Sequence, residues 1–176
     1  MSSLEELLLH FFASVADREK GAAYIEEHPE RFQELLALAC SPEENREHIV
    51  AAWVLEKYAL ARLDCLDNCL ETFLQGTLVQ THESKRRPMI KLTYHYCRNK
   101  KRRKALSSEV KDTLVEICFS YLLEAEKIAS IAFALKTLDY FLDHAPWIRK
   151  ETIAYIERES PLRGRSFQAV VRHMHL

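Results

Sequence analysis

Hydrophobic residues recur along most of the chain at spacings of three and four, the period of an amphipathic α-helix. The stretch 3–15 shows the pattern plainly, with apolar residues at Leu4, Leu7, Leu8, Phe11, Phe12 and Val15. The same spacing predicts further helices at 17–28, 30–40, 43–60, 62–76, 84–98, 108–124, 126–143, 146–159 and 162–174. The sequence therefore predicts an all-α fold of about nine or ten helices.

The predicted helices alternate between two kinds. Those of the first kind are apolar over a broad surface and should be buried on several sides; they are 43–60, 84–98 and 126–143. Those of the second kind carry one apolar stripe opposite a wet face; they are 62–76, 108–124 and 146–159. Aligning Trp53 with Lys91 and Phe133 gives periods of about 38 and 42 residues, close to the roughly 40–47 residues of HEAT and armadillo units. This alternation favours an α-α superhelix of stacked helix pairs over the alternative, an irregular helical bundle.

Capping and breaking residues supply the expected ends of several helices. Gly76 suits a C-terminal stop, and Ser108 is a candidate N-cap. Pro88 should lie in the first turn of its helix or kink it, whereas Pro146 suits a first turn. The basic residues that follow helix 84–98 are expected to form a loop.

Three segments resemble HEAT repeats. Ile49–Lys57 resembles the first helix of such a repeat, Ile128–Leu138 is similar, and Trp147–Ile153 resembles a second helix. The resemblance covers about 30–160 and implies a HEAT-like repeat solenoid within a single domain, 1–176, with capping helices at either end. It also implies binding of protein or nucleic acid on an extended surface, without a particular reaction.

Composition agrees with a helical protein. Only three Gly and five Pro occur in 176 residues, fewer than a fold with many tight turns would need. Five cysteines occur without a CxxC pair and fall mostly on apolar helix positions, which predicts reduced core thiols and neither metal nor cofactor. Glu5 and Glu6 stand where a signal peptide would be positive, and no apolar run is long enough to cross a bilayer, so the prediction is a cytoplasmic protein without membrane contact.

Charge is distributed unevenly. Residues 84–104 hold ten basic side chains and no acidic one. This predicted basic ridge consists of Lys85, Arg86, Arg87, Lys91, Arg98, Lys100, Lys101, Arg102, Arg103 and Lys104. Residues 1–83, by contrast, carry six basic and sixteen acidic side chains. A net charge of −1 thus hides a polarised molecule.

Three interpretations of the ridge stay open. It can dock an acidic protein surface, including the acidic half of a second copy. It can instead hold phosphates of a nucleic acid or another polyanion, with Tyr94, His95 and Tyr96 beside it for stacking. The third interpretation is a solvated loop without a partner. A protein partner is the preferred hypothesis, with nucleic acid as the alternative.

A second candidate surface is acidic. If the chain has HEAT geometry, the second helix of each pair lines the concave side. That groove would then carry Asp64, Asp67, Asp112 and Glu116, which suits a basic peptide.

Catalytic signatures are missing from the sequence. It has no GxGxxG, P-loop, GxSxG or HExxH pattern. The HEAT-like alkylpurine DNA glycosylases are an alternative by fold, but they rely on several tryptophans, and Trp53 and Trp147 look like core or interface residues. A lyase of the adenylosuccinate class is a weaker alternative, because its Gly-Ser-Ser-x-Met-Pro loop is lacking. The prediction is a non-enzymatic scaffold or adaptor.

Overall fold

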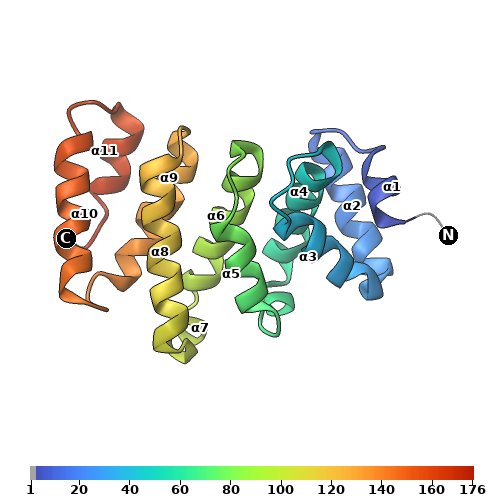
Figure 1. Cartoon of the computed structure of the whole chain (residues 1–176), viewed down its shortest axis with the longest axis horizontal. Coiled ribbons are helices and arrows are strands. Elements are labelled where there is room, and N and C mark those ends of the chain that lie inside the picture. The colour runs from blue at the N-terminus through green and yellow to red at the C-terminus, as the bar shows by residue number, and fades with distance from the viewer. Residues whose placement is uncertain (1–2) are drawn as a thin grey trace. The chain divides into compact units, whose positions relative to one another are not determined.

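All regular structure is helical across residues 3–176, the part of the chain that this computed structural model describes (Figure 1). The prediction of an all-α fold is confirmed. The chain divides into two compact units, Met1–Leu92 and Thr93–Leu176, which are described separately below. One domain over 1–176 stays a prediction.

Unit one is built around a single central helix. Its elements are α1 Leu4–Leu8, α2 Val15–Glu27, η1 Pro29–Arg31, α3 Phe32–Cys40, α4 Arg46–Ala61, η2 Leu63–Leu66, α5 Leu70–Leu78 and the first part of α6 Glu83–Arg98. Helix α4 packs against α1, α2 and α3. Its apolar run is buried on several sides, including Val50, Val54 and Leu55, as the crowded pattern predicted.

Unit two contains the rest of α6 and five more α-helices. These are α7 Lys100–Ala105, α8 Ser108–Glu124, α9 Ile128–Leu138, α10 Pro146–Glu159 and α11 Arg165–Val171, with the 3₁₀ turn η3 Asp139–Phe141 after α9. Helix α9 packs against α8 and α11. Fully buried side chains such as Tyr121, Leu135 and Phe167 form the core of this unit.

The predicted helix 3–15 is wrong in its second half. Helix α1 ends at Leu8, and Ser14 opens α2 by accepting a hydrogen bond from the Asp17 amide at 3.1 Å. Phe12 and Val15 therefore leave the expected apolar face and are each 65% exposed. A local capping signal here overrides the longer hydrophobic period.

Other predicted helix ends also shift. Ser107, not Ser108, caps α8 by accepting from the Val110 amide at 3.2 Å. Gly76 lies inside α5 rather than at its end. A Cβ atom at this position would come within 2.3 Å of Cys40 Cβ, so glycine permits the close packing of α5 on α3.

Pro88 lies inside α6, beyond its first turn. Proline has no N–H, so the Ser84 carbonyl loses its usual donor four residues later. The Trp53 indole Nε1 donates to this carbonyl at 2.8 Å instead. The carbonyl that Pro88 leaves without a backbone donor in α6 thus accepts a hydrogen bond from α4.

Candidate binding surfaces

Part of the predicted basic ridge is not on the surface. Lys85 is fully buried and Arg86 is 3% exposed. Lys91 is half-buried and pairs with the buried Glu56, its Nζ lying 2.6 Å from Oε1. Because these three side chains serve the fold of unit one, including Lys85 and Arg86 in an exposed ridge was wrong.

Lys85 caps the end of α3. Its Nζ donates to the carbonyl oxygens of Ser41 at 2.5 Å and Glu43 at 2.9 Å. These carbonyls lie just past the C-terminus of α3, where unpaired acceptors and the helix dipole favour a cation. Burial lowers the pKa of the Lys85 ammonium from 10.5 to about 8. Gln80, also buried, donates to the carbonyls of Cys40 and Ser41 and so completes the cap.

The exposed basic residues are concentrated on one short helix. Arg87 is exposed in unit one, whereas Arg98, Lys100, Lys101 and Lys104 are exposed in unit two. The expected loop is in fact helix α7, because Asn99 caps it by accepting from the Arg102 amide at 3.1 Å.

Two half-buried arginines anchor α7 to its unit. Arg103 Nη1 donates to the Cys97 carbonyl at 2.6 Å, and its guanidinium lies 4.3 Å from the centre of the Tyr140 ring. Arg102 lies 5.5 Å from the Tyr96 ring. These cation–π contacts offset the repulsion among the neighbouring positive charges of α7. The arginines thus hold the helix in place while its lysines remain exposed to solvent.

A stack of aromatic rings lies beside α7. The rings of Tyr94 and Tyr140 are 6.2 Å apart and nearly parallel at 13°, and Lys136 Nζ lies 5.8 Å from Tyr94. Burial, and then the neighbouring Tyr94, raise the pKa of Tyr140. The stack borders a hollow of about 360 Å³ lined by Tyr94, Lys136, Asp139, Tyr140, Ala169, Val170, His173, Met174 and His175.

The predicted acidic residues fall into two separate pairs. Asp64 and Asp67 are exposed at η2 in unit one, whereas Asp112 and Glu116 are exposed on α8 in unit two. The structure therefore gives each unit an acidic pair of its own. A groove shared by all four stays a prediction.

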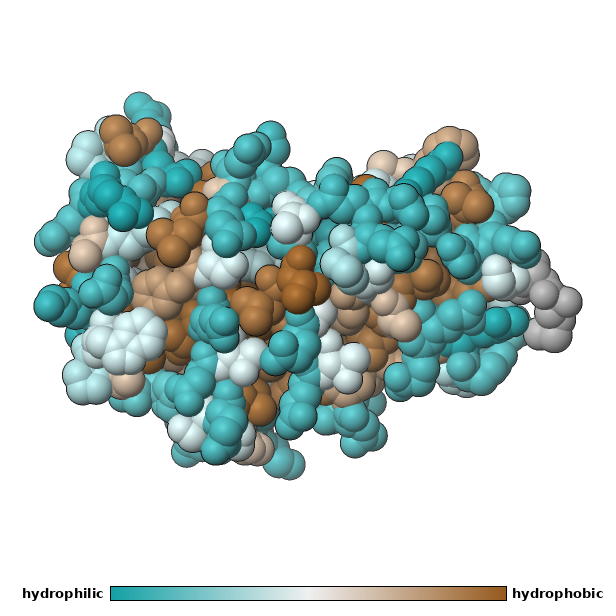
Figure 2. Space-filling model, in the orientation of Figure 1, coloured by the Kyte–Doolittle hydropathy of each residue, from teal (hydrophilic) through white to brown (hydrophobic). Residues whose placement is uncertain are grey.

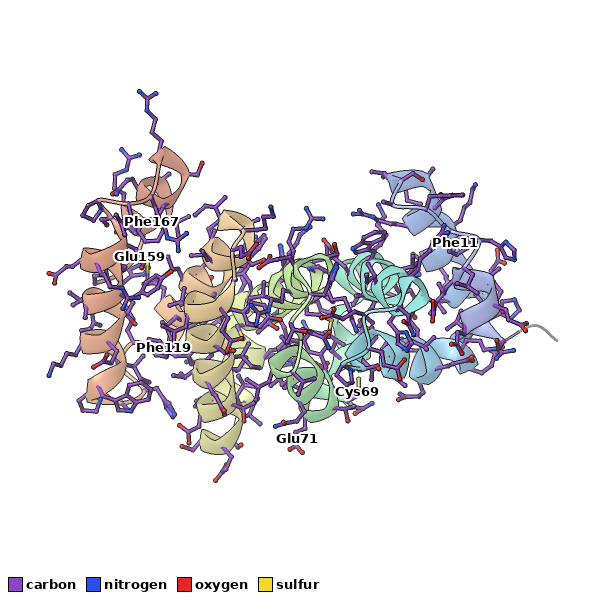
Figure 3. All side chains as sticks on the ribbon, turned by 45° about the horizontal axis from the view of Figure 1, so that its top comes forward. Phe11, Cys69, Glu71, Phe119, Glu159 and Phe167 are labelled. Atoms are coloured by element: carbon purple, nitrogen blue, oxygen red, sulfur yellow. The ribbon has the colours of Figure 1, made fainter. Side chains whose placement is uncertain are left out.

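The α8 pair borders a hollow that was not among the predictions from the sequence. About 480 Å³ in volume, it is lined by Asp112, Val115, Glu116, Phe119, Ser120 and Trp147. Trp147 lies in the first turn of α10 and is 52% exposed, and its ring lies 5.6 Å from that of Phe119. Figure 3 places Phe119 between the ribbons of α8 and α10. Trp147 is thus not a core residue; the signal for the hollow was the mixed acidic and apolar face of α8 at spacings of three and four.

Two of the five cysteines, Cys97 and Cys118, are buried, whereas Cys40, Cys65 and Cys69 are partly exposed. All five are free. Burial raises the pKa of Cys97 to about 12 and that of Cys118 well above its ordinary value, so both remain protonated thiols at neutral pH. Within residues 3–176, no group of three or more His, Cys, Asp or Glu side chains is arranged to hold a metal ion.

Comparison with known protein families, with curated proteins and with solved structures gives no match to this chain. None of the helices described here combines the length and hydropathy needed to cross a membrane.

Proposed function

We propose that the protein is a HEAT-like scaffold or adaptor that binds a macromolecular partner through exposed side chains. The exposure of Lys100, Lys101 and Lys104 together on α7 carries this proposal. Arginine contacts to Tyr96 and Tyr140 already fix the base of this helix, so its lysines have no evident role in folding. Three exposed ammonium groups on one short helix suit an acidic protein surface.

The HEAT-like superhelix is part of this proposal. Two observations support it: neighbouring helices pack together within each unit, as α3 does with α4 and α8 with α9, and aligned segments recur at about 38 and 42 residues. A compact domain of 176 residues has a radius of gyration of about 16 Å. A stacked repeat should exceed this value in small-angle X-ray scattering, and a radius at or below it would contradict the superhelix.

Charge reversal on α7 tests the adaptor function. In pull-downs from an extract of the cells that naturally make this protein, we expect the wild type to capture partner proteins. The variant carrying Lys100→Glu, Lys101→Glu and Lys104→Glu should no longer capture them. A matched control reverses three other exposed cations of unit two, Lys127, Lys150 and Arg165, and should retain them. Equal capture by all three proteins would contradict a role for α7.

A nucleic acid or other polyanion is the second candidate partner. The observation that favours it is the tyrosine pair beside α7, because stacked aromatic rings and cations together suit single strands. In this case binding to RNA, DNA or heparin should weaken steeply with salt, with a slope that falls by roughly 0.7–0.9 for each phosphate contact that the α7 reversal removes. Absence of binding at low salt would exclude this candidate.

A further inference from the structure

The hollow between α8 and the start of α10 combines an exposed aromatic ring with carboxylates. Trp147 and Phe119 supply the aromatic surface, and Asp112 and Glu116 project from successive turns of α8. Brown, hydrophobic surface between α8 and α10 is visible in Figure 2. Tryptophan is the side chain most enriched at binding hot spots, and an indole left half-exposed in a hollow offers such an anchor.

The charges around the hollow favour a cation. His144 Nε2 lies 2.8 Å from one oxygen of Asp112. Glu116 has no ion-pair partner within residues 3–176, and its carboxylate stays exposed. The nearest cations along α10, Arg149 and Lys150, line a different hollow, and Arg149 pairs with Asp143 at 2.7 Å. A positive group entering here therefore meets at least one carboxylate that no side chain neutralises.

We infer that this hollow binds a lysine or arginine side chain from a basic peptide segment of a partner protein, and this inference rests on the proposed adaptor function. The cationic group lies over the face of the Trp147 indole, where the ring quadrupole attracts it. Glu116 and the outer oxygen of Asp112 pair with it from the α8 side. Phe119 and Val115 contact the aliphatic part of the same side chain or an apolar neighbour in the peptide.

Peptide binding by fluorescence anisotropy tests the inference. The probe is a fluorescein-labelled peptide composed of Lys, Arg, Leu and Ser, and its matched control has Glu at every basic position. We expect the basic peptide to bind at least tenfold more tightly to the wild type. Trp147→Ala should weaken its binding by about fivefold, because it removes a cation–π contact at an exposed site. Glu116→Gln should weaken it by about threefold, because it removes an exposed ion pair.

Two control variants separate the hollow from the rest of the surface. Leu123→Ala removes an exposed apolar side chain of α8 that does not line the hollow, and Glu124→Gln removes an exposed carboxylate two turns beyond Glu116. Both should bind the basic peptide as the wild type does. Circular dichroism should show that Trp147→Ala keeps the wild-type helix content, because the side chain is half-exposed.

Two results of the peptide-binding experiment would overturn the inference. One is unchanged affinity of the basic peptide for Trp147→Ala; the other is no binding by the wild type at about 1 mM protein and low salt. The adaptor function is judged apart from this experiment. If the native partner is captured equally by the wild type and Trp147→Ala but lost on α7 reversal, the adaptor proposal stands and the peptide site does not.

Discussion

The beginning of α6 and the helix α7 are both rich in basic residues, yet those of α6 are partly buried in the fold whereas the lysines of α7 are exposed. Lys85 in α6 is fully buried and caps α3 through the carbonyls of Ser41 and Glu43. Lys101 in α7 is exposed, on a helix held in place by its arginines. A run of like charge in a sequence therefore does not define a surface. Whether each side chain is exposed depends on the helix face that it occupies and on the hydrogen-bond acceptors within its reach.

The two tryptophans differ in the same way, one serving the fold and one exposed, and replacing Trp53 should have the largest effect on the free energy of unfolding. Trp53 donates to Ser84 at 2.8 Å and lies 4.9 Å from the Arg18 guanidinium. Trp53→Ala should lower the free energy of unfolding by about 3 kcal/mol, because it leaves a void at α4 and an unpaired carbonyl in α6. Trp147→Ala should lower it by less than about 1 kcal/mol, since that ring is half-exposed. Urea denaturation measures both, and equal losses would contradict the contrast.

Replacing the buried lysine should have the next largest effect. Lys85→Ala removes a fully buried side chain and the donor for two carbonyls, so we expect a loss of about 2–3 kcal/mol in the free energy of unfolding. Lys101 is exposed, so Lys101→Ala should change the free energy of unfolding by less than about 0.5 kcal/mol. A small loss for Lys85→Ala in chemical denaturation would mean that the cap at the end of α3 is dispensable.

The core thiols make stability fall at high pH. Their folded pKa values lie above the ordinary value of 9.0, at about 12 for Cys97. The unfolded chain therefore releases protons that the folded chain keeps, so stability that is fully present below pH 9 is lost as the pH rises toward 12. Each such thiol contributes up to about 1.4 kcal/mol per pH unit. Urea denaturation in reductant between pH 8 and 10 should show this fall, and a Cys97→Ala variant should show a shallower one.

Lys85 acts in the opposite direction over a lower pH range. Its folded pKa of about 8 lies below the ordinary 10.5, so the unfolded chain holds more protons between these values. Stability from this group rises with pH through that window. The difference in unfolding free energy between the wild type and Lys85→Ala should therefore grow by about 1 kcal/mol from pH 7 to pH 9. A constant difference would mean that Lys85 is not desolvated.

Some of this arrangement follows from sequence and some depends on distant contacts. The run 49–55 is apolar on all sides, which is sufficient to predict that α4 is buried from several directions. The burial of Lys85 could not be predicted in the same way, because the carbonyls that it caps belong to residues more than forty positions earlier. Helix α7 was missed because its basic composition suggested a loop. The Asn99 cap is a local signal for this helix, whereas the contact of Arg103 with Tyr140 comes from a distant part of the sequence.

The candidate binding surfaces also combine residues that share one helix with residues brought together by packing between helices. Asp112 and Glu116 were predicted, with Asp64 and Asp67, to line a groove of HEAT repeats, and the structure places these two carboxylates at exposed positions one turn apart on α8. Trp147, from a different helix, completes the hollow through a contact that no periodicity encodes. Local patterns thus predicted which residues share a helix face, whereas which faces meet depends on packing between helices.

The smallest expected effect is on the folding of the α7 reversal. Lys100→Glu, Lys101→Glu and Lys104→Glu together should change the free energy of unfolding by no more than about 0.5 kcal/mol, because the three side chains are exposed and the anchoring arginines remain. The reversal also removes like-charge repulsion and places an acid in the first turn of α7, both of which favour the helix slightly. The measurement is urea denaturation at low salt. A loss above about 1 kcal/mol would show that these lysines support the fold, and their exposure would then no longer indicate a binding surface.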